Sequence, residues 1–363
     1  MINQDIWQGT PIFLTGHTGF KGAWLALWLE KLGAQVYGYA LPAETVPSLH
    51  QLAPAHLKQE TLADIADLKT LQEAMTAAQP TVIFHLAAQS LVRRSFAEPL
   101  ESFATNVQGT AHVLEAARHV DSVKAIIVVT TDKVYEADAH SHAFAETDPL
   151  GGYDPYAASK ACAELVTQSY RRSFLNARDV RVATARAGNV IGGGDWAAER
   201  IVPDMIAAAD QHAPVRLRYP NAVRPWQHVL EPLAGYMLLA EHLLTQKQPI
   251  ETLNFGPDPE NFKTVAQLVE AFHALYLPTA GWQAMDGPAP HETEILTLNS
   301  HRARQSLGWK PRLDFRATLR WTADWYLAFR GQKDMAAYTR KQIENYECLM
   351  QESTQNRREK ASS

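Results

Sequence analysis

The chain has 363 residues, of which 46% are hydrophobic and 20% are charged, and its formal net charge is −5 at pH 7. This composition is typical of a folded globular protein with one large domain or two packed domains, and it excludes a largely disordered chain. The sequence contains no run of five or more basic residues, so we expect no nucleic-acid partner.

Signals for export, membrane insertion and metal binding are also missing. Residues 1–8 lack a basic region followed by an apolar stretch, and no segment approaches the roughly 18 uninterrupted apolar residues of a membrane span. Two cysteines, Cys162 and Cys348, are too few for a disulfide framework or a four-ligand zinc site. We expect a cytoplasmic protein with no membrane partner and no metal site, and we place His140 and His142 in a solvated loop.

The first half of the sequence alternates short β-branched runs with longer stretches rich in Ala and Leu, which indicates a parallel sheet with crossover helices. Most of the strands are nearly continuous apolar runs, as expected where helices cover both faces of a sheet. The predicted strands are Pro11 to Thr15, Gln35 to Tyr39, Thr81 to His85 and Ala125 to Thr130. The predicted helices are Ala23 to Leu32, Leu68 to Ala78, Pro99 to His119, Pro155 to Asn176, Pro203 to Asp210 and Pro232 to Leu244.

Beyond about Gly188 the sequence becomes richer in Gly, Pro and Trp, which indicates shorter elements and a second lobe. We therefore predict an α/β protein whose doubly wound parallel Rossmann sheet covers residues 1–187, with residues 229–255 returning to it. A smaller mixed substrate-binding lobe is expected mainly over residues 188–350. Residues 351–363 are polar enough to form a frayed tail.

A glycine-rich turn, TGHTGFKG, joins the first predicted strand to the first long helix. Its glycines, Gly16, Gly19 and Gly22, follow a GxxGxxG spacing that permits a tight turn and close approach to a pyrophosphate, while the helix N-terminus offers unpaired N–H groups. A purely structural turn is the alternative, but the strand before and the helix after favour dinucleotide binding. Lys21 is expected to be solvated.

The segment after the second strand bears on the choice of cofactor. It contains neither the acidic residue that normally holds the adenosine ribose nor a basic residue for the phosphate of NADP, since Lys58 is the next basic residue. This pattern favours NAD. Asp64 is placed to meet the adenine amino group or, alternatively, to cap the next helix. Gln89 and Ser90 follow the third strand and are expected to face the reaction space.

A YxxxK pair, Tyr156 and Lys160, places both side chains on the same face of a predicted helix. A chance match is about as probable as not, but its position after the glycine-rich turn and after the strand that leads to Thr131 favours a catalytic pair. A tyrosine has an unperturbed pKa of about 10, so it serves as a base near neutrality only if cations lower that pKa. We expect Lys160 and an oxidised nicotinamide to do this, which implies oxidation of an alcohol.

Together these segments resemble the extended short-chain dehydrogenases and, more narrowly, the nucleotide-sugar 4,6-dehydratases. The resemblance covers nearly the whole chain. It rests on the motifs TGHTGFKG, HLAAQSLVR, TTDKVY, GGYDPYAASK, RAGNVIGGGDW, RIVPD and RPWQHVLEP. It implies hydride transfer from C4 of the sugar to NAD, elimination of water across C5 and C6, and return of the hydride to C6.

The resemblance also implies roles for five residues. Thr131 matches the hydroxyl residue beside the sugar, Tyr156 the base at the 4-hydroxyl, Lys160 the residue that binds the nicotinamide ribose, and Asp132 the acid that expels the 6-hydroxyl. Relatives acting on dTDP-glucose usually carry Glu after this Asp, whereas Lys133 follows the pattern of the CDP-glucose branch. We hypothesise that Lys133, neutral when buried, removes the C5 proton. Alternatively, Asp132 and Lys133 merely cap the end of the strand.

The cofactor site implied by the resemblance comprises residues from the turn and from the ends of the following strands. These are Gly16, Thr18, Gly19, Phe20, Gly22, Asp64, Ile65, Leu86, Ala87, Ala88, Gln89, Thr105, Tyr156 and Lys160. The substrate site contains arginines, which suit a diphosphate, although each could instead serve a surface salt bridge. Its residues are Gln89, Ser90, Asn189, Arg200, Val202, Arg224 and His291.

Two alternative functions remain open at this point. One is a 4-epimerase or another nucleotide-sugar dehydratase with the same fold, cofactor and Tyr-Lys pair. The other is an NAD-binding sensor that has lost catalysis, which an intact Thr131, Tyr156 and Lys160 argues against. Relatives associate through two helices, so we expect a homodimer, or a homotetramer, formed through residues 99–119 and 155–176.

Overall fold

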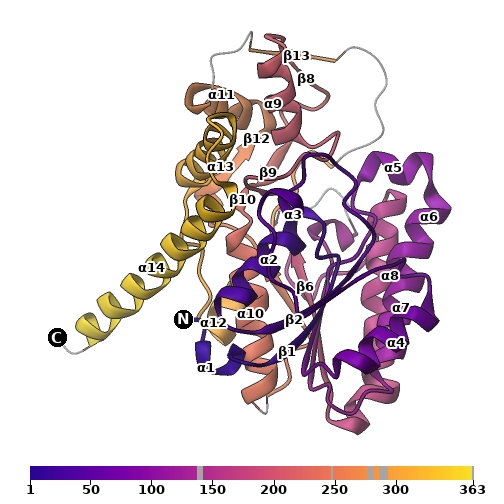
Figure 1. Ribbon diagram of the computed structural model, residues 1–363. Coiled ribbons are helices and arrows are strands. Elements are labelled where there is room, and N and C mark those ends of the chain that lie inside the picture. Colours follow the sequence, from indigo (N-terminus) through magenta and orange to yellow (C-terminus); the bar gives the residue numbers. More distant parts are fainter. Residues whose placement is uncertain (137–141, 247, 277–280, 286–292, 362–363) are drawn as a thin grey trace.

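The computed structural model describes residues 1–136, 142–246, 248–276, 281–285 and 293–361, with side chains up to residue 352. Within these residues a seven-stranded, all-parallel sheet forms the centre of the molecule (Figure 1). Its order is β11-β6-β5-β4-β1-β2-β3. The strands are β1 (Pro11–Thr15), β2 (Gln35–Ala40), β3 (Gln59–Leu62), β4 (Val82–His85), β5 (Ala125–Val129), β6 (Arg181–Ala187) and β11 (Thr252–Phe255). The order reverses between β1 and β4, and ligands of such sheets bind at the carboxyl ends of the strands at that point.

Helices cover both faces of the sheet, as Figure 1 shows. One face carries α2 (Phe20–Lys31) and α10 (Leu230–Thr245), and the other carries α4 (Leu68–Ala78), α7 (Gly109–Ala117) and α8 (Pro155–Tyr170). Successive strand residues divide between the two cores, because strand side chains alternate. Ile12 and Leu14 lie in the core under α2, whereas Phe13 lies in the core under α4 and α7. The predicted doubly wound α/β fold is confirmed.

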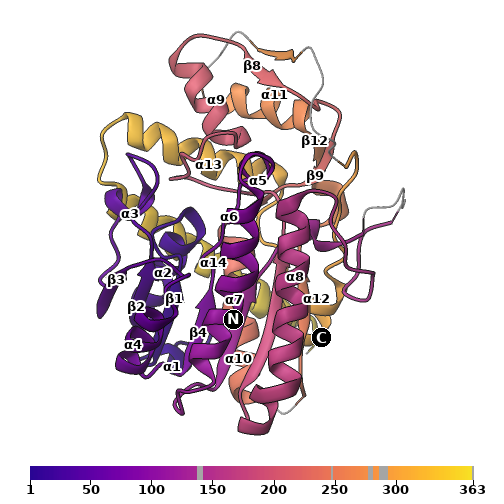
Figure 2. The same cartoon turned by 90° about the vertical axis from the view of Figure 1, so that its right-hand side faces the viewer.

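The smaller lobe lies above the carboxyl ends of the strands (Figure 2). It consists of short paired strands and two helices. The strands are β8 (Val215–Leu217) with β13 (Trp282–Ala284), β9 (Val223–Pro225) with β12 (Phe262–Thr264), and β7 (Val190–Ile191) with β10 (Gln227–His228). The helices are α9 (Ile201–Asp210) and α11 (Val265–Leu275). Between β10 and β12 the chain returns to the sheet through α10 and β11. The exact domain boundaries stay a prediction.

The remaining elements connect or flank these two parts. They are α1 (Gln4–Trp7), α3 (Leu49–Leu52), α5 (Val92–Ala97), α6 (Pro99–Phe103), α12 (His301–Leu307), α13 (Phe315–Arg330) and α14 (Met335–Ala361). The predicted helix 99–119 is continuous up to Ala117 and contains a π-helical segment at 104–108 between α6 and α7. A second π-helical segment, at 171–175, follows α8. No helix in the described ranges is long and apolar enough to span a membrane.

The segment that we predicted to be a frayed polar tail from residue 351 is helical up to Ala361. Helix α14 continues to Ala361, and its polar residues are mainly Gln, Glu, Arg and Lys. These residues have high helix propensity, so polarity alone does not end a helix. Further back along α14, Glu347 accepts hydrogen bonds from Trp28 and Lys31, which attaches the helix to α2.

A buried ion pair joins α8 to the sheet. Glu164 and Arg186 are 5% and 3% exposed, and the guanidinium donates from Nε and Nη2 to the two carboxylate oxygens at 2.9 Å each. Thr130 and Thr184 donate to the same carboxylate at 2.5 and 2.6 Å. Both carboxylate oxygens of Glu164 are hydrogen-bonded, so the buried charges compensate each other. These bonds fix the position of α8 relative to β5 and β6.

We expect Glu164→Gln to lower the free energy of unfolding by about 3 kcal/mol, because it leaves the Arg186 guanidinium buried without a countercharge. Urea denaturation of the purified protein measures this. The matched control is Glu115→Gln, whose partner Arg118 lies at the surface and whose loss should cost less than about 1 kcal/mol. Equal losses in the two variants would contradict the role assigned to the buried pair.

Candidate active site

The glycine-rich turn forms a cradle whose shape depends on two glycines. Gly16 has a φ of 77°, and a Cβ there would lie 2.7 Å from the backbone nitrogen of Ala87. A Cβ on Gly22 would lie 2.0 Å from the carbonyl oxygen of Gly16. Gly19 precedes α2 without a side-chain cap, so the first N–H groups of the helix face the turn unblocked. This cradle suits a pyrophosphate.

A cleft of about 660 Å³ opens above this turn, between the strand ends and the smaller lobe. Every predicted site residue within the described part of the chain lines it, and His291 lies outside the described residues. From the sheet side these residues are Gly16, Thr18, Gly19, Phe20, Gly22, Asp64, Ile65, Leu86, Ala87, Ala88, Gln89, Ser90, Thr105, Thr131, Asp132, Lys133, Tyr156 and Lys160; from the smaller lobe they are Asn189, Arg200, Val202 and Arg224. The structure thus brings together residues that are up to about 200 positions apart, while their individual roles stay predictions.

Tyr156 is positioned by the start of α8. Asp154 caps the helix by accepting from the Ala157 N–H at 2.8 Å, and Pro155 occupies the first turn. The Tyr156 side chain is 8% exposed. Burial raises the pKa of Tyr156 to about 12, while a hydrogen bond with Thr131 and the charge of Arg200 oppose that rise. In the protein alone the phenol is therefore protonated, and a base role needs further positive charge from bound cofactor.

Lys160 lies one helical turn further along α8 and is buried. Its Nζ donates to the carbonyl oxygen of Val129 at 2.9 Å, at the end of β5. Burial lowers the pKa of Lys160 to about 8, opposed by the charge of Glu164. This hydrogen bond anchors the ammonium at the carboxyl end of β5. The effect of Lys160 on the pKa of Tyr156 with cofactor bound stays a prediction.

Asp132 lies directly after β5 and is 2% exposed. Its Oδ1 accepts from the Thr131 hydroxyl at 3.1 Å, while Oδ2 is buried without a hydrogen-bond partner among the described residues. The Gly188 backbone packs on the carboxyl so closely that a Cβ there would lie 1.6 Å from Oδ2. Asp132 lines the same cleft as Tyr156, so this oxygen could form a hydrogen bond with a bound substrate.

Lys133 also lines the cleft, but it is only partly buried. The full burial that we expected to neutralise its ammonium is therefore absent in the protein alone. Lys133 lies in a short 3-10 turn between two buried residues, Asp132 and Val134, and only its own side chain is partly exposed. A bound sugar nucleotide would cover this side chain, so the hypothesis that Lys133 is the C5 base stays a prediction.

Gln89 lines the cleft, yet its side-chain amide is turned into its own loop. Nε2 donates to Ser102 at 2.7 Å and to the Leu91 carbonyl at 3.1 Å, and Oε1 accepts from the Leu91 N–H at 2.6 Å. Gln89 belongs to the lining of the cleft, and its role at the reaction space stays a prediction. Leu91 follows so soon in the chain that its backbone satisfies the amide locally.

The segment after β2 contains charged groups that the sequence analysis did not place there. Glu44 lines the cleft and accepts from Arg94 of α5 at 2.8 Å, and Arg94 also pairs with Glu101 at 2.6 Å. Two carboxylates thus compensate the charge of Arg94, which disfavours the additional phosphate of NADP at this position. Asp64 uses Oδ1 to accept from the Ala66 N–H at 2.9 Å, while Asp67 caps α4.

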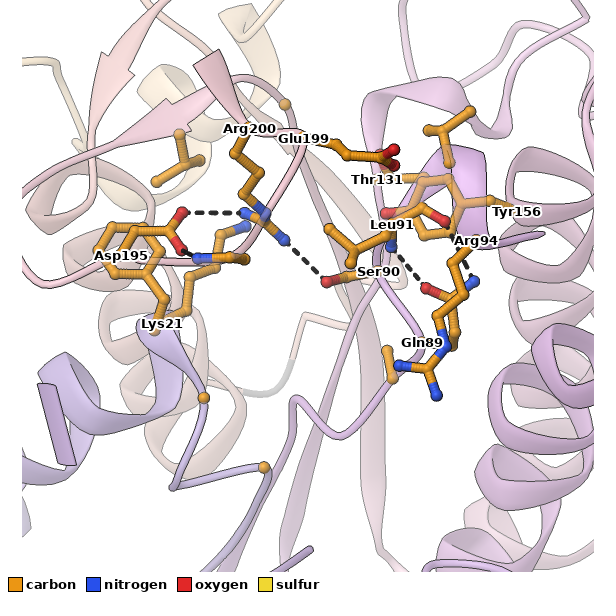
Figure 3. Close-up of a pocket in the computed structure, with 18 of the residues that line it drawn as sticks. Lys21, Gln89, Ser90, Leu91, Arg94, Thr131, Tyr156, Asp195, Glu199 and Arg200 are labelled. Carbon is orange, nitrogen blue, oxygen red and sulfur yellow. Dashed lines mark hydrogen bonds and ion pairs between the residues drawn. The ribbon is translucent and has the colours of Figure 1, made fainter. Parts of the chain in front are cut away.

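Arg200 connects the two lobes across the cleft (Figure 3). Its Nη2 donates to the Ser90 hydroxyl at 2.7 Å, and its Nη1 lies 3.5 Å from a carboxylate oxygen of Asp195. A second link, between Arg93 and Glu199 at 2.6 Å, lies beside it. Arg200 stands at the start of α9 and is 30% exposed on its side chain. This guanidinium therefore lies where an anionic ligand would meet both lobes.

Arg224 reaches the cleft from β9 and is 2% exposed. Its Nη1 donates to the carbonyl oxygens of Val223 and Glu294, at 2.8 and 3.2 Å. These bonds fix the plane of the guanidinium within the smaller lobe. A buried, oriented arginine is suited to two parallel hydrogen bonds with a phosphate.

Lys21 was missed by the sequence analysis, which expected it to be solvated. It lines the cleft from the first turn of α2 and extends toward Arg200 (Figure 3). Burial and the nearby charge of Arg200 lower the pKa of Lys21 to about 7, opposed by Asp132. The available signal was its place inside the GxxGxxG turn, where a side chain of the first helical turn faces the ligand.

We expect Lys21→Met to weaken the binding of a diphosphate ligand, NAD or CDP, about tenfold at pH 6, because a charge-assisted hydrogen bond is lost. Lys21 is charged below its pKa of about 7 and neutral above it. Wild-type affinity should therefore fall as the pH rises above about 7, and the variant should lose this dependence. Isothermal titration calorimetry at pH 6 and 8.5 measures both, and Lys21→Arg should keep tight binding at both values. An unchanged pH dependence in Lys21→Met would rule out this role.

Comparison with known proteins places the chain in a family. The family profile described as GDP-mannose 4,6 dehydratase matches residues 13–265. The chain is similar to a CDP-glucose 4,6-dehydratase of Salmonella typhimurium, with 42% identity over 95% of this chain and 98% of that protein. It is also similar to a dTDP-glucose 4,6-dehydratase of Streptomyces antibioticus, with 34% identity over 72% of this chain and 74% of that protein.

Solved structures show the same fold at lower identity. The UDP-glucose 4-epimerase of Thermotoga maritima with UDP-glucose matches with a TM-score of 0.78 and 22% identity over 88% of this chain and 99% of that one. The dTDP-glucose 4,6-dehydratase of Bacillus anthracis in complex with NAD matches with a TM-score of 0.75 and 22% identity over 90% and 99%. The resemblance seen in the sequence motifs is confirmed: the chain belongs to the GDP-mannose 4,6 dehydratase family.

Proposed function

We propose that the chain is an NAD-dependent CDP-glucose 4,6-dehydratase that converts CDP-D-glucose into CDP-4-keto-6-deoxy-D-glucose and water. The observation that carries this proposal is the 42% identity, over nearly the full length of both chains, to a CDP-glucose 4,6-dehydratase. The cleft supports it, because Asp132 and Lys133 lie at one strand end together with Tyr156. A 4-epimerase would need the tyrosine but not an acid and a base for elimination.

The residues of the cleft fit a dinucleotide. Gly16 and Gly22 leave no space for a Cβ, and the uncapped N-terminus of α2 faces the turn. Charge compensation of Arg94 by Glu44 and Glu101 favours NAD over NADP. The chemistry that bound NAD supplies is reversible hydride transfer, first from C4 of the sugar and finally to C6.

The protein's own groups handle the protons. Tyr156 takes the proton of the 4-hydroxyl as C4 is oxidised, with Thr131 hydrogen-bonded to the phenol. Oxidation at C4 acidifies the C5 proton, which Lys133 removes. Asp132 gives a proton to the departing 6-hydroxyl, which leaves as water. Re-protonation of C5 from solvent, with hydride return to C6, completes the 6-deoxy sugar, so one water is lost per substrate and no net oxidation occurs.

Two arginines are assigned to the diphosphate of the substrate. Arg200 and Arg224 bind the diphosphate, the first as a bridge to Ser90 and the second with its guanidinium fixed by backbone carbonyls. Asn189 and Val202 line the same part of the cleft.

Incubation of the purified protein with CDP-glucose and, separately, with dTDP-glucose, UDP-glucose and GDP-mannose tests the proposal. Formation of a 4-keto-6-deoxy product from CDP-glucose without net NADH release, identified by mass and NMR, is the expected result. Product from another nucleotide alone would overturn the assignment to CDP-glucose. A 4-epimer would favour the epimerase alternative, and NAD binding without turnover would favour the sensor.

We further propose that the enzyme is a homodimer. Large apolar side chains are exposed along neighbouring helices: Leu100 (83%) and Phe103 (37%) on α6, Leu165 (55%) on α8, and Phe174 (43%) just after it. Figure 2 shows α6, α7 and α8 side by side on one face of the molecule. Such a patch on helices is typical of a subunit interface, and two copies would form a four-helix contact through α6–α7 and α8.

The double variant Leu100→Glu with Leu165→Glu should be monomeric, because two carboxylates would be desolvated in each half of the interface. Light scattering coupled to size-exclusion chromatography measures the mass of each species. Leu62→Glu, on β3 and 52% exposed, is the matched control and should keep the wild-type mass. A wild-type protein that is monomeric at micromolar concentration would contradict the dimer.

We place the enzyme in the cytoplasm. Cys162 and Cys348 are both free thiols, one half-buried and the other exposed. Thiols of this kind persist in a reducing compartment.

A further inference from the structure

Three side chains from different segments converge beside the glycine-rich turn. His17 lies within the turn itself, His50 lies on α3 and Glu60 lies on β3; Figure 2 shows α3 above the end of β3. The Glu60 Oε1 atom is 2.8 Å from Nε2 of His17 and 3.3 Å from Nε2 of His50. All three potential ligand atoms lie within 4.8 Å of one another.

The His17 ring is held in place by the strand beneath it. Its side chain is 0% exposed, and a Cβ on Gly38 of β2 would lie 2.7 Å from its Nδ1. The ring of His50 stands edge-on to it, with centroids 5.5 Å apart. Burial lowers the pKa of His17, opposed by the hydrogen bond with Glu60. The ring is therefore oriented with Nε2 toward Glu60, and its neutral form, which is the one that binds metals, is favoured.

The separations of these atoms match those around a metal ion. In a tetrahedral zinc site with bonds of about 2.0–2.1 Å, two ligand atoms lie roughly 3.3 Å apart. The two separations to Glu60 are 2.8 and 3.3 Å, and the two histidine nitrogens lie within 4.8 Å of each other. Side-chain movements of about an ångström would therefore place one ion between the three ligands. His50 and Glu60 are 25% and 37% exposed on their side chains, which leaves an entry path and room for a water as fourth ligand.

The donor set selects the class of ion. Two imidazole nitrogens and one carboxylate suit borderline divalent ions such as Zn²⁺, Co²⁺ and Ni²⁺, whereas Mg²⁺ and Ca²⁺ prefer oxygen ligands alone. The other histidine–carboxylate contacts of the described residues differ in kind. His119 with Glu115 and His142 with Asp148 each offer a single exposed histidine.

We propose that His17, His50 and Glu60 form a binding site for a divalent transition-metal ion, with Zn²⁺ as the natural probe. Because His17 lies between Gly16 and Thr18, the bound ion ties the phosphate-binding turn to α3 and β3. The sequence analysis predicted no metal site, since the three ligands are separated by 33 and 10 positions in the chain and form no local motif.

The test uses the tag-free, full-length chain carrying Cys348→Ser, so that its exposed thiol does not compete for metal. After treatment with EDTA and dialysis, the protein is titrated with Zn²⁺ by calorimetry and with Co²⁺ by visible absorption. We expect one equivalent to bind, with Co²⁺ bands typical of a four-coordinate site. His50→Ala and Glu60→Gln should each weaken Zn²⁺ at least tenfold, whereas His119→Ala, the matched control, should not.

Two results would overturn the proposal: no stoichiometric binding by the wild-type chain, or unchanged affinity in both His50→Ala and Glu60→Gln. Folding of each variant is checked by thermal unfolding without metal, so a misfolded variant is not counted. Hydrogen–deuterium exchange of the peptide that covers residues 13–22 tests the link to the turn. Slower exchange with Zn²⁺ in the wild type, and no change in His50→Ala, is expected; binding without slower exchange would contradict the link. None of these measurements depends on the dehydratase activity.

Discussion

Tyr156→Phe should lower the turnover of CDP-glucose by about 10³-fold or more, because it removes the only group that the account assigns to the 4-hydroxyl proton. General acid–base groups contribute typically about 10²–10⁴-fold, and here the first step of the reaction depends on one. The phenol is 8% exposed and hydrogen-bonded with Thr131, so loss of its oxygen leaves the ring in place. Steady-state rates give the size of the effect, and NAD affinity should change little.

Tyr153→Phe provides the matched control for this prediction. Tyr153 also lines the cleft but is 73% exposed, so removal of its hydroxyl should leave turnover within a few-fold of wild type. A Tyr156→Phe enzyme that retained a tenth or more of the wild-type rate would show that another group takes the proton.

Lys133→Met should separate oxidation from elimination. Without the base, we expect overall turnover to fall by about 10²–10³-fold, while a single hydride transfer from C4 still occurs and appears as a transient rise in reduced-cofactor absorbance. In D₂O the wild-type product should carry deuterium at C5, since that proton is removed and replaced from solvent. In the variant, the rate of deuterium incorporation at C5 should fall by the same factor as the rate of product formation.

A control variant of Lys133 distinguishes the effect of its positive charge from its role as a base. Lys133→Arg keeps a cation at the mouth of the cleft but offers no neutral amine, so it should resemble the Met variant in C5 exchange. Normal C5 exchange in Lys133→Met would show that Lys133 does not remove the C5 proton. Lys133 would then be only a capping residue after β5. Rescue of exchange by Arg would instead indicate a purely electrostatic role.

Much of the fold and cofactor cradle follows from sequence because its signals are local. Strands such as Pro11–Thr15 are continuous apolar runs buried by helices on both faces, and the GxxGxxG turn lies next to its own helix. Residues at the carboxyl ends of parallel strands meet at one edge of the sheet, which is why Thr131, Asp132 and Ala87 line the same cleft.

Other features depend on contacts between distant segments, which spacing does not reveal. Gln89 lines the cleft, and its amide donates to Ser102, thirteen residues further along the chain. Lys21 was expected in solvent, yet α2 directs it into the cleft beneath the smaller lobe. The convergence of His17 and His50 on Glu60 requires the register of β2 with β3, and this register is set by the whole sheet rather than by any one segment.

The most direct measurement of the central claim follows the C4 hydrogen. CDP-glucose deuterated at C4 is incubated with enzyme and NAD, and the product is examined by NMR. The expected product is CDP-4-keto-6-deoxyglucose with deuterium at C6, with no net formation of reduced cofactor. Deuterium that remained at C4, in substrate or in its 4-epimer, or a 6-deoxy product without the label, would contradict it.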